Sequence, residues 1–168
     1  QRVAEDFAPF DVDVTTELTN ESVLTRATAT DEVFGVRVLI SPISSYVGNY
    51  GGIAYVGVFD ATSDYYKPAL VFPERLQNSE KYIAEASSHE AGHSLGLSHD
   101  GTSTGTAYYL GQGSGECAWA PIMGAGYYKN LSQWSKGEYA NPNNTEDDVA
   151  VMQSNGLPLR ADDHGNTR

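Results

Sequence analysis

The sequence predicts one globular domain of mixed α/β (α+β) class, with strands in its first half and helices after them. Four short apolar segments lie between residues 10 and 72, and two segments with helical signals follow. The chain has 168 residues, of which 40% are hydrophobic and 19% charged. A chain of this length and composition can bury a substantial core, so it is expected to be neither disordered nor fibrous.

Four segments have the patterns of β-strands. Residues 10–14 alternate apolar and acidic side chains, as a half-buried strand does. Residues 36–40 are more apolar, which favours a central strand. Residues 52–59 form a third candidate, whose glycines weaken side-chain packing but allow another backbone to approach closely. Residues 69–72 form a fourth, which ends at Pro73.

A long helix is expected after the fourth strand. Asn78 or Ser79 can cap a helix that runs to about Leu95. Gly96 follows, and glycine enters the left-handed conformation without steric cost, which ends a helix and turns the chain sharply. Residues 1–7 also have an amphipathic pattern, which we expect to be the end of a helix.

A second helix is expected near the end of the chain. Thr145 and Asp148 approximate a capping box, and nearby acidic side chains favour the positive start of a helix dipole. Residues 149–152 continue this helix, which stops at Gly156. A calcium site in the acidic run 141–148 is the alternative interpretation of the same residues.

The expected domain spans residues 1–156, and we expect that its N-terminal part is missing from this sequence. Residues 157–168 are rich in turn-forming side chains and contain a proline. We therefore interpret them as a linker toward a further region.

The segment HEAGHSLGLSHD, residues 89–100, has the spacing of a catalytic zinc site. His89 and His93 are four residues apart, so on a helix both rings project from one face and can bind a single ion. Glu90 lies beside them and can take a proton from a zinc-bound water as general base. The turn at Gly96 can return His99 to the same metal. Three protein ligands would leave the fourth position open for water.

A purely structural zinc site is the alternative to a catalytic one. Structural sites are normally closed by four protein ligands and are rich in cysteine. This chain has one cysteine, and Glu90 would have no purpose at a closed site.

The segment resembles the metzincin signature HExxHxxGxxH, which is followed downstream by a turn containing methionine. Residues 121–124, Pro-Ile-Met-Gly, are similar to that turn, and Asp100 after the third histidine resembles the reprolysin or adamalysin type. The resemblance extends to the cysteine, Ile-Met pair and later aromatic-Ser step of residues 117–135. It implies a twisted mixed sheet with an antiparallel edge strand packed on the active-site helix, then a Met-turn and a C-terminal helix. It also implies that Met123 forms a hydrophobic floor beneath the imidazoles and that Asp100 anchors the loop after the helix.

The same resemblance implies how substrate is held. In metzincins an extended peptide adds to an antiparallel edge strand, and residues 52–59 occupy that place in this sequence. The primary specificity pocket lies between the zinc helix and the segment after Met123. The expected substrate-binding residues are Gly52, Ile53, Ala54, Tyr55, Gly124 and Tyr127.

Two residues depart from related families. Some metzincins carry a tyrosine two residues after the methionine that approaches the metal, but this chain has Ala125 there. Tyr127 and Tyr128 come later, and the interpretation as pocket wall stays open beside a role in the transition state. Cys117 has no partner for a disulfide, so we expect it to be a buried small hydrophobic residue.

The charge balance restricts the partners. The formal net charge is −12 and the sequence pI about 4.5, so binding to nucleic acids or to anionic membrane surfaces is not expected. No apolar run approaches the ~20 residues that span a bilayer. The oligomeric state stays open.

These observations predict a secreted zinc endopeptidase that acts on protein or peptide substrates and resembles the bacterial secreted type of reprolysin-like enzyme. Its one expected cofactor is a catalytic zinc ion, while calcium has no support beyond the acidic run. A catalytically silent protein-binding module with the same fold is one alternative, although the intact Glu90 argues against it. A zinc hydrolase acting on a non-peptide amide is another.

Overall fold

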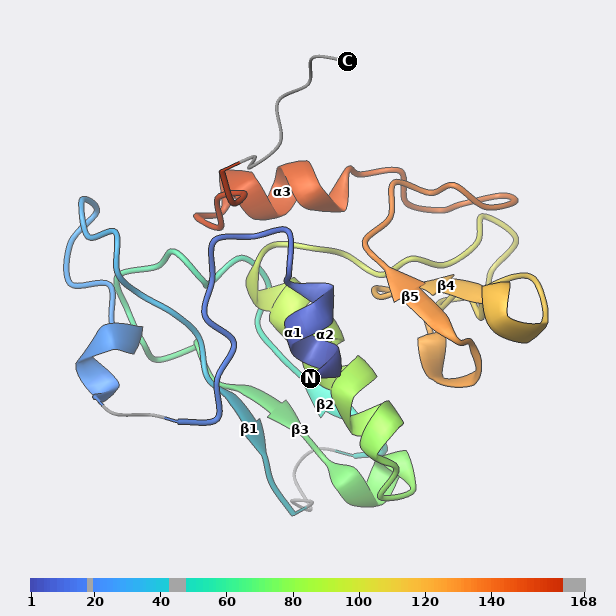
Figure 1. Ribbon diagram of the computed structural model, residues 1–168, viewed down its shortest axis with the longest axis horizontal. Helices are drawn as coiled ribbons and strands as arrows, with labels where there is room; N and C mark the ends of the chain where they lie inside the picture. Colours follow the sequence, from blue (N-terminus) through green and yellow to red (C-terminus); the bar gives the residue numbers. More distant parts are fainter. Residues whose placement is uncertain (18–19, 43–47, 162–168) are drawn as a thin grey trace.

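The fifteen-residue helix α2 (Glu80–Ser94) runs through the centre of the computed structural model, which describes residues 1–17, 20–42 and 48–161. Figure 1 shows a three-stranded sheet on one side of α2 and a two-stranded sheet on the other, with α3 (Asp148–Ser154) lying across one end. The short α1 (Arg2–Asp6) packs against α2. The mixed α/β class predicted from the sequence is confirmed.

The three-stranded sheet is mixed, with strand order β1-β3-β2. The central strand β3 (Ala69–Val71) pairs in parallel with β1 (Val38–Ile40) and antiparallel with β2 (Gly52–Ile53). The antiparallel edge strand is therefore β2, as expected. The expectation that residues 36–40 form the central strand is wrong, because β1 is the other edge and its Leu39 and Ile40 side chains are 45% and 54% exposed.

Two expected strands are shorter than their patterns suggest. Of residues 10–14, only Phe10 pairs, in an isolated antiparallel bridge with Leu159. Of residues 52–59, only β2 is a strand. Gly57 has a φ of +67°, which turns the chain. The amides of residues 57–59 then donate to the carbonyls of His93 and Ser94 at the end of α2 instead of to a neighbouring strand.

Both ends of α2 follow from local chemistry. The Ser79 hydroxyl accepts a hydrogen bond from the Tyr82 amide and caps the start of the helix. At the other end Gly96 has a φ of +99°. The amide of Leu97 donates to the Gly92 carbonyl, and that of Gly96 to the His93 carbonyl. This is the Schellman pattern, and it satisfies carbonyls that would otherwise have no partner.

The C-terminal helix α3 begins at a different cap from the expected one. Asp147, not Thr145, is the N-cap, and its carboxylate accepts from the Ala150 amide. Asp148 turns inward, is buried, and accepts from the Ser135 amide at 2.8 Å. The capping box fails because Asp148 bonds to another part of the chain.

The segment after α3 begins by packing on the domain. Leu157 is buried, and the amide of Arg160 donates to the Pro9 carbonyl. Residues up to Arg160 therefore follow the surface of the domain, and residues 162–168 lie outside the described part of the chain.

The second sheet pairs β4 (Trp119–Pro121) in parallel with β5 (Leu131–Gln133). The 3₁₀ helix η4 (Gly126–Tyr128) lies between them in the chain. Another 3₁₀ turn, η3 (Gly115–Cys117), comes before β4. Cys117 is free and exposed there, so the expectation that it is buried is wrong. The other 3₁₀ turns are η1 (Glu21–Leu24) and η2 (Pro73–Leu76).

The main core packs around the end of α2. Its centre includes Leu95, Leu97, Met123 and Met152, each at most 2% exposed. Burying such a side chain contributes about 1.5–3 kcal/mol, so this cluster holds α2, α3 and the segment after β4 together. No helix within the described ranges is long and apolar enough to cross a membrane.

Candidate metal centre

Three histidines converge at the end of α2. One ring nitrogen from each of His89, His93 and His99 lies within 4.8 Å of the other two. Among the described residues this is the one group of three or more histidine, cysteine or acidic side chains that could hold a metal ion. The Nε2 atoms of His93 and His99 are 2.9 Å apart.

Backbone carbonyls orient two of the rings. Nδ1 of His89 lies 2.8 Å from the Ile122 carbonyl oxygen, and Nδ1 of His93 lies 2.8 Å from that of Leu97. An Nδ1–H that donates to a carbonyl leaves the Nε2 lone pair free for a metal. Burial lowers the pKa of His89 to about 3 and lowers the pKa of His93 and His99 as well. All three rings are therefore neutral at pH 7, the form that binds metal.

The donor set fits zinc. Two nitrogens that bind zinc tetrahedrally at ~2.05 Å are about 3.3 Å apart, and the 2.9 Å between His93 and His99 is close to this. Three neutral imidazoles, with no fourth protein ligand among residues 1–17, 20–42 and 48–161, fit the arrangement of a catalytic zinc site.

The turn after α2 brings the third histidine back to the first two. Gly96 is required there for two reasons. Its φ of +99° is strained for other residues, and a Cβ at this position would lie 2.7 Å from Nδ2 of Asn155, at the end of α3. Gly96 therefore has the left-handed conformation expected at the end of the helix, and the contact with α3 adds a second constraint.

Glu90 lies beside the ligands but is not one of them. Its side chain is 7% exposed, and burial raises its pKa to about 7. The carboxylate presses against β2, since a Cβ on Gly52 would lie 2.6 Å from both Cγ and Oε1 of Glu90. A carboxyl group that titrates near neutral pH is suited to accept and release a proton there.

The methionine turn, residues 121–124, packs against helix α2, which carries His89 and His93. The amide of Gly124 donates to the Pro121 carbonyl at 3.0 Å and closes the turn. Met123 is fully buried, and a Cβ on Gly92 would lie 2.6 Å from its sulfur. Gly92 was not singled out from the sequence. A glycine inside a helix, between two ligands, is the signal that could have identified it.

Asp100 connects the third ligand to this turn. Its amide donates to the Met123 carbonyl at 2.9 Å, and its buried carboxylate accepts from the Tyr139 hydroxyl at 3.4 Å. Burial raises the pKa of Asp100 to about 6. These contacts connect the segment after the third histidine to the methionine turn and to Tyr139.

The expected substrate-binding residues do not all lie in one element. Gly52 and Ile53 form the edge strand β2, whereas Ala54 and Tyr55 follow it. The amide of Phe72 donates to the Gly51 carbonyl. Since bonded and non-bonded pairs alternate in an antiparallel ladder, the N–H and C=O of Gly52 face the open edge and those of Ile53 face β3.

The other two expected residues lie after the methionine. Gly124 is buried in the turn. The ring of Tyr127, in η4, packs 5.0 Å from that of Tyr82 on α2. Tyr127 therefore forms part of the wall between α2 and η4, the place expected for the specificity pocket.

Two residues near the site gave no sequence signal. The Nζ of Lys81 donates to the carbonyls of Gly126, Tyr127 and Lys129, so one ammonium group ties η4 to α2. Tyr108 packs on His99, with 4.4 Å between ring centroids. Neither contact has a local signature, because Lys81 is more than 40 residues away from its partners in the chain and Tyr108 lies in a loop.

A mixed sheet packed on a helix that carries two of three convergent histidines fits the class of zinc metallopeptidases. The model of the metallo-peptidase family M12B, described as reprolysin-like, matches residues 10–100. The match covers more than half of the chain, from the buried Phe10 to the end of the histidine motif. The chain therefore belongs to the M12B reprolysin-like family. No match was found among curated proteins.

Proposed function

We propose that this protein is a secreted zinc endopeptidase that cleaves internal bonds of extended peptides, with Glu90 as its general base. The contact between Glu90 and Gly52 carries the proposal. It joins a buried carboxyl group on the ligand helix to the backbone of the open sheet edge. The expected proton acceptor and the expected peptide-binding edge therefore meet at one point.

A zinc ion held by the three histidines would polarise the scissile carbonyl and lower the pKa of its water toward ~7. Glu90 takes the proton from the attacking water and later passes it to the leaving amine. The raised pKa of Glu90, about 7, supports both transfers near neutral pH. Its position against β2 holds the carboxylate on the side from which the peptide approaches.

The substrate is held by backbone hydrogen bonds along β2. The outward N–H and C=O of Gly52 can pair with an extended peptide, as in other cases of strand addition. Pairing between backbones depends little on the side chains of the peptide. Selectivity therefore comes from the wall between α2 and η4. An open edge can bind the middle of a peptide substrate, and this supports the cleavage of internal bonds.

The proposal that the enzyme is secreted rests on its resemblance to secreted reprolysin-like proteases. Expression of the complete gene in its own host, followed by detection of the protein in the culture medium, tests this part. Retention of the protein inside the cells would contradict it.

Glu90→Gln tests the assigned base. The amide is nearly isosteric but accepts no proton at neutral pH, so the variant should keep its zinc and lose ~10²–10⁴-fold in kcat. Glu116→Gln, an exposed position in η3, is the matched control and should cleave casein at the parent rate. Cleavage by Glu90→Gln at the parent rate would show that the base is misassigned.

The same assay separates the alternatives. A zinc-loaded parent protein that binds extended peptides without cleaving them would be a silent binding module. Hydrolysis of small amides without cleavage of casein or oligopeptides would point to a non-peptide substrate.

A further inference from the structure

Tyr108 borders the metal site from the loop that follows the third histidine. Its ring centroid lies 4.4 Å from that of His99 and 6.1 Å from that of His89. The side chain is 39% exposed. Within the described part of the chain, its hydroxyl has no hydrogen-bond partner. A phenol is therefore held against two metal ligands with its donor free.

Two hydrogen bonds fix the backbone of Tyr109, the residue that follows Tyr108. The amide of Tyr109 donates to the Asp100 carbonyl, and its carbonyl accepts from the Ala125 amide at 2.9 Å. This connects the loop to the residue after the third ligand and to the methionine turn. The ring of Tyr109 stacks on Tyr139 at 4.1 Å and 10°. Because Tyr109 is anchored, the position of Tyr108 is built into the fold rather than left to a free loop.

The hydroxyl of Tyr108 lies within electrostatic range of the proposed base. A tyrosine hydroxyl ordinarily has a pKa of about 10. The phenol therefore stays protonated and remains a donor at neutral pH. The peptide carbonyl that reacts must lie between the metal ligands and Glu90, and the ring of Tyr108 lies beside two of those ligands.

We propose that the Tyr108 hydroxyl donates a hydrogen bond to the carbonyl oxygen of the scissile peptide and stabilises the negative charge that develops there. This role rests on the proposed peptidase function and adds a catalytic residue to it. The phenol keeps its proton throughout, so the step is electrostatic stabilisation only. A preorganised donor of this kind is worth about 10²–10³-fold in kcat.

Tyr108→Phe tests the proposal, because it removes the hydroxyl and keeps the ring that packs on His99. The zinc-loaded variant should lose about 10²-fold in kcat with little change in KM. Binding gives a second readout. A phosphinic peptide mimics the tetrahedral species with its oxygens. Its affinity for the variant, measured by calorimetry, should fall by about the same factor as kcat. Affinity for a cleaved product peptide should stay unchanged, and so should the zinc content.

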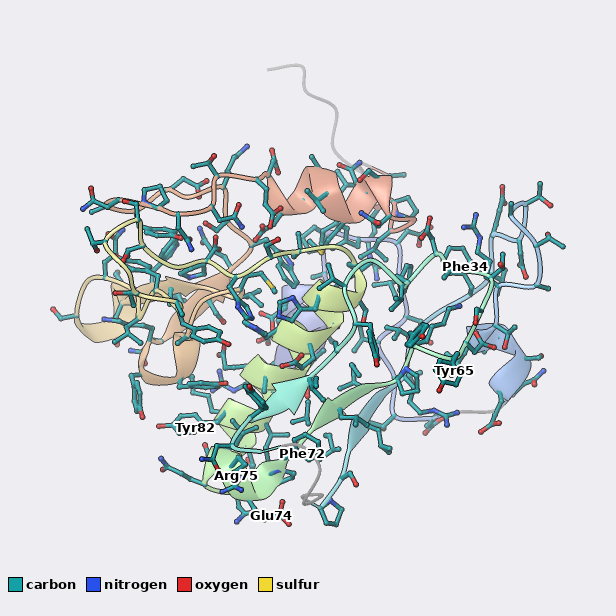
Figure 2. All side chains as sticks on the ribbon, turned by 180° about the vertical axis from the view of Figure 1, so that it is seen from behind. Phe34, Tyr65, Phe72, Glu74, Arg75 and Tyr82 are labelled. Atoms are coloured by element: carbon teal, nitrogen blue, oxygen red, sulfur yellow. The ribbon has the colours of Figure 1, made fainter. Side chains whose placement is uncertain are left out.

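Tyr65→Phe is the matched control. Figure 2 shows Tyr65 on the opposite side of the molecule from Tyr82, whose ring contacts Tyr127. This variant should match the parent in every readout. Tyr127→Phe is compared in parallel, and a loss confined to that variant would assign the donor to Tyr127 instead.

The outcomes separate this inference from the proposed function. If the parent cleaves peptides and Tyr108→Phe equals it in kcat and in phosphinic-peptide affinity, the role of Tyr108 is refuted and the peptidase function stands. Equal losses of affinity for the phosphinic and product peptides would mean that the hydroxyl only shapes the cleft, which also refutes the role. A zinc-loaded parent that cleaves no peptide contradicts both.

Discussion

Gly52→Ala should disable the peptidase by displacing its base, although the substitution lies outside the histidine motif. The new Cβ would lie 2.6 Å from Cγ and Oε1 of Glu90 and 2.8 Å from Cδ. Contacting carbon atoms normally lie about 3.5–4.0 Å apart, so the two groups must separate by about 1 Å. Because Cγ lies close to the helix backbone, the whole carboxylate swings away from its position.

The magnitude follows from this displacement. A 1 Å misplacement at a reacting centre can cost ~10²-fold, so kcat/KM should fall by about that factor, equivalent to about 2.7 kcal/mol. Zinc content should not change, since Glu90 is not a ligand. Cleavage of a fluorogenic peptide, with zinc determined on the same samples, measures both quantities.

Gly51→Ala is the matched control. Its Cβ would meet the Leu76 side chain, with Cδ2 at 2.8 Å and Cγ at 3.4 Å, rather than Glu90. The kcat/KM of this control should stay within about threefold of the parent value, since its contact with Leu76 does not move Glu90. If Gly52→Ala acts through Glu90, it should lower activity no further in a Glu90→Gln background. An equal loss in both backgrounds, or a fully active Gly52→Ala, would refute the reasoning.

Three further changes test other parts of the account. Ala54 comes two residues after Gly52, so by the same alternation its amide faces the open edge. Ala54→Pro should therefore remove this amide and raise KM about fivefold, the equivalent of a ~1 kcal/mol hydrogen bond, with kcat kept; an unchanged KM in a folded variant would place the substrate elsewhere. Gly92→Ala should push against the Met123 sulfur and destabilise the protein by about 1–3 kcal/mol in urea unfolding, and unchanged stability would contradict that packing. Burial raises the pKa of Asp148 from 3.8 to about 8, so the stability gained by its protonated form is lost as pH rises between these values. The Tm of the parent should therefore fall relative to that of Asp148→Asn from pH 5 to 9, and parallel pH profiles would argue against a buried, ionising Asp148.

The parts of the site that the sequence could predict are those with local causes. His89, Glu90 and His93 lie within one turn and a half of a helix whose start is set by a capping serine. Gly96 ends that helix through a conformation that glycine adopts without steric cost. Spacing along the chain was therefore sufficient to predict the helix, the turn and the return of the third ligand.

The parts that failed depend on contacts between distant segments. The composition of a single strand does not determine the order of strands in a sheet. The apolar pattern of residues 36–40 therefore predicted a central strand, although β3 lies at the centre. Residues 57–59 have a strand-like pattern but bond to the end of α2. Cys117 looked like a core residue from its type alone and lies on an exposed turn.

The same reason explains the residues that were missed. Lys81 holds carbonyls more than 40 residues away, and Tyr108 reaches the histidines through a loop without periodicity. Asp148 bonds to Ser135 across the domain rather than to its own helix start. Each of these contacts can be recognised only in the folded chain.

An anomalous difference map at the zinc absorption edge, from crystals of the protein grown with zinc, tests the central claim most directly. The account predicts one strong peak bonded to Nε2 of His89 and His93 and to a nitrogen of His99, with no fourth protein ligand. Absence of zinc at the three histidines, in a protein that still cleaves peptides, would contradict it.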